Sequence, residues 1–393
     1  IQASPSCRSP HFCWKQTRRF SLRIHTAARE TSQPILLLWP INWPKFFSGP
    51  LLKSLELHKT MPTVYLPGEP RLSTSLSFLA PLQDDIRAVE GMMLAQMEGH
   101  HTDLRNALDL ILKSGGKRIR TSLTLLSGRT FGADPQRLKT LAAAIELLHT
   151  ATLVHDDLID GSLLRRGLPT LNSQWSPGAT VLTGDFLFAR AAVLAADTES
   201  IPVIRQFAHV LGVIVNGEIT QLFASRCKAS RDDYYERIYA KTASLFETST
   251  WSAAVIGGAD APAVEAMRNY GYQIGMAFQI IDDILDFTSD AAQMGKPVGS
   301  DLRQGLVTLP CLYYLEDHTD DPDVQPLFQG RCLSDEQLSR AVASIRESHA
   351  IERSYQEAER FVHLGLESLR TVPPSPERSA LEELADYIVA RKL

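Results

Sequence analysis

Cysteine is scarce in this chain, which has only five among 393 residues, at scattered positions. Thiols so few and so widely spaced do not form the disulfide framework of a small secreted domain, and no CxxC pair indicates a zinc site. A positive net charge is also lacking, because 45 acidic residues outnumber 40 lysines and arginines. A general nucleic-acid-binding protein is usually basic. The composition therefore argues against a disulfide scaffold, a zinc module and a nucleic-acid binder.

Long hydrophobic runs are lacking as well. A membrane-spanning helix needs roughly 20 consecutive apolar residues, and the nearest candidate, residues 35–47, is interrupted by Pro40 and Pro44. The sequence therefore predicts no membrane span. With 44% hydrophobic and 22% charged residues, the composition is typical of a globular protein.

Residues 1–60 differ from the rest of the chain, because lysine and arginine greatly outnumber acidic residues and no helical period runs through them. Such an acid-poor leader with Arg and Ser resembles a mitochondrial transit peptide. The alternative is that the stretch is not native protein but a product of upstream translation, since Met61 stands just before the patterned part. We therefore expect a basic leader over residues 1–60 and a domain over residues 61–393, mitochondrial on the first interpretation and cytoplasmic on the second.

From residue 76 onward, amphipathic helical patterns fill almost the whole chain, with Gly or Pro between them. No alternation of strands and helices appears, so a doubly wound sheet is not expected. We expect one all-α domain, a helical bundle without an internal repeat. The expected helices cover residues 76–99, 103–113, 117–131, 135–160, 177–196, 200–225, 230–257, 261–287, 309–317, 335–348, 350–370 and 376–391.

Two aspartate clusters with the same DDxxD spacing lie on otherwise apolar helices. They are Asp156, Asp157 and Asp160 in the first and Asp282, Asp283 and Asp286 in the second. Aspartates four residues apart share a helix face, where they repel one another and are costly to desolvate unless cations neutralise them. One such cluster is readily explained as a solvated acidic face, but this explanation fits two such clusters on apolar helices poorly. Oxygen ligands without nearby Cys or His suit Mg²⁺, which is usually shared with substrate phosphates.

Basic residues surround both clusters in the sequence. Arginine side chains and helix N-termini are suited to phosphate oxygens, although each residue taken singly is compatible with an ordinary surface charge. Together with the paired aspartate clusters they indicate two diphosphate sites. The residues are Lys117, Arg118 and Arg120 in GGKRIR, Arg165 and Arg166 after the first cluster, Lys241 in KTASLF and Lys296 in GKPVGSD.

The order of these motifs resembles the trans-prenyl diphosphate synthases, the family of farnesyl, geranylgeranyl and longer polyprenyl diphosphate synthases. The resemblance covers roughly residues 80–391 and includes GGKRIR, ELLHTATLVHDDLIDGSLLRRG, GDFLFARA, KTAS, GYQIGMAFQIIDDILDF and GKPVGSDLRQGLVTLP. It implies an isoprenoid-synthase helical bundle with a central cavity, acting as a homodimer. The implied reaction joins isopentenyl diphosphate to an allylic diphosphate with three Mg²⁺ ions, by ionisation, condensation and elimination. The departing diphosphate would accept the final proton.

The resemblance also implies a role for each residue of the site. The direct Mg²⁺ ligands would be Asp156, Asp160 and Asp282, with Asp157, Asp283 and Asp286 as second-shell or water-mediated partners. The isopentenyl diphosphate site would contain Lys117, Arg120, His149 and Arg166, and the allylic diphosphate site Arg165, Lys241 and Lys296. The allylic cation would be stabilised by Lys241, Thr242 and Gln279. Taken alone, a histidine such as His149 on an apolar helix is more commonly a hydrogen-bonded core residue.

Two positions depart from the family's pattern. Thr121 stands where GGKRxRP has proline, and we expect little effect because proline at a helix start only presets φ. Leu306 stands where DLxxGKxTLP has lysine, so one cationic contact at the mouth of the site is expected to be missing.

The helix before the first cluster carries a stripe of residues that bears on product length. Ala144, Leu148 and Ala151 are spaced four and three apart and lead away from Asp156. In short-chain relatives a bulky aromatic residue at the place of Ala151 or Thr152 forms the floor of the pocket. Small residues here predict a long product of about C30–C50, for a quinone side chain. The alternative is that they only permit close helix packing.

Other functions share parts of this pattern. A short-chain synthase making C15–C20 products would carry the same two clusters. A class I terpene cyclase shares the fold and one DDxxD, but usually has an Asn/Asp–Ser/Thr–Glu motif in place of the second cluster. A non-catalytic subunit of a heteromeric synthase would be expected to lose aspartates or basic residues, and here both sets are complete.

Overall fold

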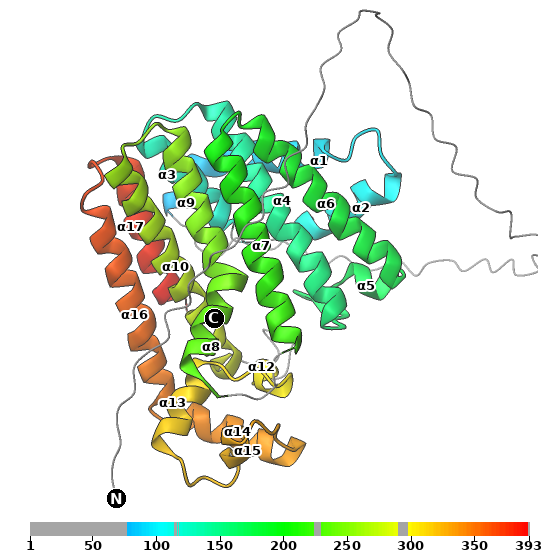
Figure 1. Ribbon diagram of the computed structural model, residues 1–393, viewed down its shortest axis with the longest axis vertical. Coiled ribbons are helices and arrows are strands. Elements are labelled where there is room, and N and C mark those ends of the chain that lie inside the picture. Colours follow the sequence, from blue (N-terminus) through cyan, green and yellow to red (C-terminus); the bar gives the residue numbers. More distant parts are fainter. Residues whose placement is uncertain (1–76, 114–115, 117, 224–228, 290–297, 392–393) are drawn as a thin grey trace, which may run out of the picture. The chain divides into compact units, whose positions relative to one another are not determined.

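The computed structural model describes residues 77–113, 116, 118–223, 229–289 and 298–391. Helices make up most of them, which confirms the expected all-α class (Figure 1). The strands found among the described residues are two short ones, β1 (Leu164–Arg165) and β2 (Leu168–Pro169), which pair antiparallel. The predictions that concern residues 1–60, Lys117 and Lys296 lie outside the described residues.

A chain shortened to begin at Met61 is expected to be as stable and as active as the full chain. The reason is that every amphipathic helix pattern lies beyond this position, so the leader has no amphipathic helix to pack against the domain. Thermal unfolding and enzymatic turnover of the two purified forms, measured side by side, check this expectation. Loss of folding or of activity in the short form would show that residues 1–60 belong to the domain.

The described helices follow the predicted order. They are η1 (Ser77–Leu82), α1 (Gln83–Ala95), α2 (Thr102–Lys113), α3 (Ile119–Thr130), α4 (Pro135–Ile159), α5 (Leu171–Gln174), α6 (Pro177–Asp197), α7 (Ile201–Phe223), α8 (Arg231–Ile238), η2 (Tyr239–Ala243), α9 (Ser244–Ile256), α10 (Ala261–Thr288), α12 (Ser300–Arg303), α13 (Leu309–Asp317), α14 (Gln325–Phe328), α15 (Asp335–Glu347), α16 (Ala350–Leu369) and α17 (Pro376–Ala390). For the predicted helices most boundaries agree within one or two residues, the usual uncertainty of helix ends. The short helices α5, α12 and α14 were not predicted.

Two of the expected helices are not continuous α-helices. The segment expected over residues 76–99 begins as the 3₁₀ helix η1, which contains Pro81, a residue that has no N–H for the α-helical ladder. The helix expected over residues 230–257 contains the π turn η2, whose sequence is YAKTA. Single π turns inside α-helices are rare and frequently lie at functional sites. Lys241 and Thr242 are both part of it.

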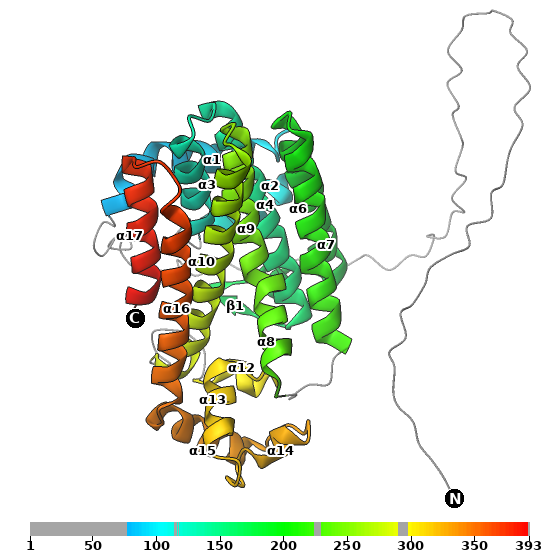
Figure 2. The same cartoon turned by 60° about the vertical axis from the view of Figure 1, so that its left-hand side comes forward.

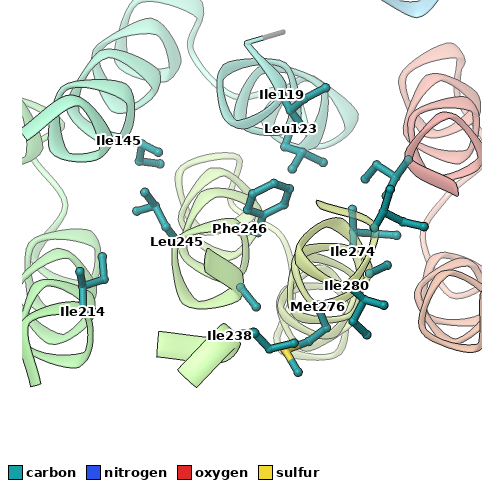
Figure 3. Close-up of a cluster of buried hydrophobic side chains, with 14 of the residues drawn as sticks. Ile119, Leu123, Ile145, Ile214, Ile238, Leu245, Phe246, Ile274, Met276 and Ile280 are labelled. Atoms are coloured by element: carbon teal, nitrogen blue, oxygen red, sulfur yellow. The ribbon is translucent and has the colours of Figure 1, made fainter. Parts of the chain in front are cut away.

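The long helices pack side by side around a shared apolar core (Figures 1 and 2). Helix α4 packs along α6, while α10 lies against both α9 and α16. Figure 3 shows part of this core, with Phe246 of α9 between side chains of α3 and α10. The ring centroids of Phe246 and Phe278 are 5.1 Å apart, which joins α9 to α10 at the level of the second aspartate cluster.

Two glycines bring α10 unusually close to η2 and α9. A Cβ added at Gly271 would lie 2.7 Å from the carbonyl oxygen of Phe246, and one added at Gly275 would lie 2.5 Å from the Cα of Ala243. Neither position therefore accepts a side chain without a backbone shift. Gln279 follows at the same spacing of four on this face, so the close approach places its side chain beside η2.

Helix α6 is long and apolar enough to cross a membrane by length and composition, which the search of the sequence for apolar runs did not pick out. In the structure it packs along α4, and its Arg190 donates to the side-chain oxygen of Gln96 at 2.6 Å. A core helix of a bundle passes the same test, so this is weak evidence for a membrane span.

Candidate active site

The π turn η2 brings the two aspartate clusters to one site. The Lys241 ammonium lies 3.2 Å from Asp156 Oδ2, at the end of α4, and 2.9 Å from Glu218 Oε1 on α7. The adjacent Thr242 hydroxyl donates a 2.6 Å hydrogen bond to Gln279 Oε1 on α10. Consecutive residues of η2 thus contact the helix of the first cluster and the helix of the second.

The Lys241 side chain is 36% exposed and lies between two less exposed carboxylates. Burial alone would lower its pKa, but the negative charges of Asp156 and Glu218 outweigh it and raise the pKa above its ordinary value. Burial raises the pKa of Glu218, against the opposing effect of Lys241. Lys241 is therefore a fixed cation at the first cluster, in a position to hold an anionic substrate.

Within the first cluster, Asp157 faces a different partner from its neighbour. Both of its carboxylate oxygens accept from Arg165 Nε, at 3.0 and 3.1 Å, and its side chain is buried. Asp160 caps the exposed C-terminal end of α4. Asp157 is thus tied to the β1 strand through Arg165, which leaves Asp156 as the aspartate that faces η2.

The second cluster is also divided between partners. Asp282 forms an ion pair with Arg391, whose buried guanidinium lies 4.2 Å from the ring centroid of Phe278. Asp286 accepts hydrogen bonds from the backbone N–H groups of Ser300 and Asp301, at 3.2 and 3.1 Å. Asp286 therefore fixes the start of α12 rather than facing η2.

Asp283 turns inward. Its carboxylate accepts from the Tyr234 hydroxyl at 2.8 Å and from the Gln279 side-chain amide at 2.8 Å. Burial, together with the negative charge of Asp301, raises the pKa of Asp283 to about 8. This aspartate is joined to Gln279 and, through it, to Thr242.

The predicted isopentenyl diphosphate residues that the structure describes form a partly buried basic group. Burial lowers the pKa of Arg120 to about 10, while the nearby charges of Glu146 and Asp282 oppose the shift. The guanidinium of Arg120 lies 4.8 Å from the Phe246 ring centroid, and its Nε is buried with no hydrogen-bond partner among the described residues. A guanidinium with a buried, unused donor is suited to an anionic ligand such as a diphosphate. Burial also lowers the pKa of Arg166, as does the charge of Arg165.

Arg118 differs from Arg120, because it is already engaged by protein carboxylates. Its Nε donates to Glu90 at 2.7 Å, and another guanidinium nitrogen lies 3.2 Å from Glu146. The Thr121 hydroxyl donates to the same Glu146 at 3.0 Å. The residue that replaces the family's proline therefore helps to hold Glu146, which partly balances the surrounding arginines.

His149 lies among these arginines. Burial lowers its pKa well below the ordinary value, and the positive charges of Arg120, Arg165 and Arg166 lower it further. A neutral imidazole is consequently the stable form in this position. It can donate one hydrogen bond to a phosphate oxygen without adding another positive charge.

The substrate-free protein is expected to lose stability at mildly acidic pH because of His149. Its pKa is lower in the folded than in the unfolded state, so the unfolded state binds the extra proton and stability falls as the pH drops below about 6.5. The variant His149→Gln removes this contribution and should show a smaller fall in melting temperature between neutral pH and about pH 5.5. Identical pH dependence of unfolding in the two proteins would contradict the burial of a neutral His149.

Comparison with known proteins settles the family. The polyprenyl synthetase family model matches residues 101–345. The chain belongs to this family. A heptaprenyl diphosphate synthase component 2 from Geobacillus stearothermophilus is 38% identical over 82% of the chain and 99% of its own length. Solanesyl-diphosphate synthase 2, chloroplastic, from rice (Oryza sativa subsp. japonica) is 36% identical over 82% of the chain and 80% of its own length.

A solved structure agrees with this assignment. A polyprenyl synthase from Caulobacter crescentus, in complex with calcium and isoprenyl diphosphate, superposes with a TM-score of 0.75 at 35% identity. The match covers 82% of this chain and all of that one. The isoprenoid-synthase bundle expected from the sequence is therefore confirmed.

The donor set of the polyprenyl synthetase site fits a divalent metal shared with a ligand. Among the described residues no three Asp, Glu, His or Cys side chains converge closely enough to bind one ion by themselves. Asp156 and Asp282, the expected direct ligands, are each neutralised by a basic side chain, Lys241 and Arg391. Carboxylates that supply few ligands each suit a divalent cation that completes its coordination with water and phosphate oxygens.

The stripe expected to set product length is buried. Ala144, Leu148 and Ala151 have no exposed surface, and the Thr152 hydroxyl donates to the carbonyl oxygen of His149 at 2.7 Å. A cavity of about 520 Å³ lies between the start of α2 and α6, and its lining does not include the stripe. The tunnel along α4 therefore stays a prediction, as do the roles assigned to these four residues.

Three residues of the site were not singled out from the sequence: Glu218, Tyr234 and Arg391. Glu218 carried a usable signal, since it is an acidic residue on the largely apolar α7. Tyr234 lies in the polar helix α8, and Arg391 lies next to α17, so nothing in their local patterns relates them to the aspartates. Only the folded chain places Tyr234 beside Asp283 and Arg391 beside Asp282.

Proposed function

We propose that the chain is a Mg²⁺-dependent prenyltransferase that adds isopentenyl diphosphate units to an allylic diphosphate and makes a long all-trans polyprenyl diphosphate. The observation that carries the proposal is the π turn η2, where Lys241 faces Asp156 and Thr242 faces Gln279. One residue offers a cation for a diphosphate, and the next offers oxygen atoms for a developing carbocation. The reaction needs these two functions side by side.

The residues divide the work of the reaction between them. Asp156, Asp160 and Asp282 would hold Mg²⁺, three ions in all, and the bound metal would neutralise negative charge on the leaving diphosphate. Lys241 would keep that diphosphate in place beside Asp156. Thr242 and Gln279 would direct oxygen atoms toward the allylic cation, which is electrostatic stabilisation of charge that develops in the transition state. The diphosphate retained at the site would accept the final proton, so no strong protein base is required.

The second substrate would bind at the basic group around His149. Arg120, with its unused buried donor, and Arg166 would hold isopentenyl diphosphate there. Arginine binds phosphate oxygens through two parallel hydrogen bonds, which fixes orientation as well as position. The double bond of isopentenyl diphosphate would then face the allylic carbon held at η2.

The proposed product length is about C30–C50. Support comes from the small residues Ala151 and Thr152 before the first cluster and from the names of the relatives, solanesyl and heptaprenyl diphosphate synthases. Such a product is suited to the side chain of a quinone. A short-chain product of C15–C20 is the alternative.

We also propose that the active form is a homodimer. Helices α6 and α7, which lie side by side (Figures 1 and 2), carry exposed apolar side chains, of which Leu182 is 69% and Ile201 66% exposed. Large exposed apolar patches mark protein contacts in many soluble proteins. Sedimentation analysis of the purified chain at micromolar concentration tests the stoichiometry.

The reaction class is tested with radiolabelled isopentenyl diphosphate and an allylic diphosphate. Label is expected to enter an extended chain, to stop when EDTA removes divalent metal, and to resume when Mg²⁺ is added back. A cyclic hydrocarbon formed from the allylic substrate alone would identify a terpene cyclase. A complete lack of turnover by the pure, folded chain would favour a subunit that needs a partner.

A further inference from the structure

A continuous chain of hydrogen bonds runs from Tyr234 to Thr242. The Tyr234 hydroxyl donates to Asp283 Oδ2 at 2.8 Å, and the Gln279 side-chain amide donates to Asp283 Oδ1 at 2.8 Å. The Thr242 hydroxyl donates to Gln279 Oε1 at 2.6 Å. Tyr234 is 1% and Asp283 4% exposed, so bulk water does not compete for these groups. The chain joins α8, α10 and η2.

The contacts of Asp283 set the direction of every hydrogen bond in this series. Its Oδ2 accepts from the Tyr234 hydroxyl and its Oδ1 accepts from the Gln279 side-chain amide, so both neighbours present donors to it. Gln279 therefore turns its NH₂ group to Asp283 and its carbonyl oxygen to Thr242. Because the Thr242 hydroxyl donates its only proton to that oxygen, only its lone pairs can face any other neighbour. In the proposed reaction that neighbour is the allylic cation.

The Tyr234 ring is held in place from two sides. It is fully packed in the core, and the guanidinium of Arg237 lies 5.5 Å from its centroid. Arg237 is itself fixed, since it donates to the carbonyl oxygen of Val307 at 2.7 Å. The hydroxyl thus reaches Asp283 from a rigid support and keeps the carboxylate from rotating.

We propose that Tyr234 is a positioning residue of the prenyl transfer, which holds Gln279 through Asp283 in the amide orientation that leaves Thr242 an acceptor toward the cation. The inference rests on the proposed function and assigns Asp283 a task at Gln279 in addition to any at the metal. Without the Tyr234 hydroxyl, Asp283 Oδ2 lacks its donor, the carboxylate rotates, and Gln279 loses its fixed partner. Groups that orient a reacting residue in this way typically change activity by about ten- to a hundredfold when they are removed.

The test compares two buried tyrosines that each lose one hydroxyl. Tyr234→Phe removes the donor to Asp283, and the control Tyr270→Phe removes an equally buried hydroxyl that donates to the carbonyl oxygen of Leu381 at 2.6 Å. Both variants are expected to melt at a lower temperature than the parent. Only Tyr234→Phe is expected to lose kcat, by about ten- to a hundredfold, with unchanged KM for both diphosphates and an unchanged Mg²⁺ concentration for half-maximal rate. Equal kcat in the two variants would overturn the proposal.

A double-mutant cycle separates positioning from general destabilisation. In a Gln279→Met background, which lacks the amide that Tyr234 is proposed to orient, Tyr234→Phe should cause no further fall in kcat. Effects that simply multiply would show that Tyr234 acts by another route and would overturn the proposal.

Asp283→Asn provides an independent variant if Tyr234→Phe is too unstable to purify. A carboxamide places an NH₂ group at one of the two positions that accept from Tyr234 and Gln279, so kcat should fall with unchanged Mg²⁺ dependence. A weaker response to Mg²⁺ with unchanged kcat at saturation would assign Asp283 to the metal alone and overturn the proposal. An inactive parent protein would contradict the proposed function, whereas an active parent with a fully active Tyr234→Phe variant would contradict this inference only.

Discussion

The variants Asp156→Asn and Asp282→Asn are each expected to lose nearly all turnover. Each substitution removes a negative charge that the proposed reaction uses to hold metal against the leaving diphosphate, while the size of the side chain is conserved. A loss of about 4 kcal/mol of transition-state stabilisation corresponds to about a thousandfold in rate, so a fall of this size or larger is expected in kcat at saturating Mg²⁺. Steady-state kinetics with both diphosphates measures it.

The two variants should differ in stability. Lys241 keeps its contact with Glu218 when Asp156 is changed, so the melting temperature of Asp156→Asn should stay close to that of the parent. Buried Arg391 loses its ion-pair partner in Asp282→Asn, so this variant should melt earlier.

A matched control lies at the start of α4, the helix that carries Asp156. Asp134→Asn changes the N-cap of α4, where Asp134 accepts from the backbone N–H groups of Gln136 and Arg137, and Asn caps a helix about equally well. This control should keep both its turnover and its melting temperature. Near-normal kcat in Asp156→Asn or Asp282→Asn at saturating Mg²⁺ would contradict the metal assignment.

Replacing Ala151 with Phe is expected to shorten the main product to about C15–C20 while activity remains. Ala151 lies five residues before Asp156, more than one turn of α4 deeper, so a ring there would close the proposed path of the growing chain and leave the aspartates in place. Chromatography of the dephosphorylated products of the parent and of Ala151→Phe measures the change.

Because Ala151 is buried, the same substitution also tests the alternative that the small residues only permit close helix packing. If protein atoms fill the space beside it, the ring overpacks the core, which costs about 1–3 kcal/mol of stability, and the product length stays unchanged. Ala143→Phe is the control, because Ala143 lies on the same helix and is equally buried but is not part of the proposed path. Ala143→Phe should lose stability without shortening the product. An unchanged product distribution in Ala151→Phe would remove the basis for the tunnel along α4.

Local sequence patterns predicted the helices well, because their information lies in the periodic alternation of apolar and polar residues. The spacing of Asp156 and Asp160, and its repeat from Asp282, predicted two acidic helix faces. The structure brings both helices to η2. The π turn itself was not predictable, since no residue of YAKTA distinguishes a π turn from an ordinary α-helical turn.

The partner that each aspartate of a cluster contacts was also not predictable without the fold. Nothing in the repeated DDxxD spacing distinguishes Asp157, tied to Arg165, from Asp156, which faces Lys241. Arg391 reaches Asp282 across more than a hundred residues of sequence, and such a contact has no local signature. The glycines of GYQIG carried a hint, because two small residues four apart permit close packing, but the partner helix is known only from the structure.

The product of the purified chain tests the central claim most directly. The protein is incubated with Mg²⁺, an allylic diphosphate and an excess of radiolabelled isopentenyl diphosphate, and the dephosphorylated products are separated by reversed-phase chromatography against all-trans standards. The proposed function predicts a main product of about C30–C50 that forms by successive additions and requires the added metal. A main product no longer than C20, a cyclic hydrocarbon, or no labelled product at all would contradict it.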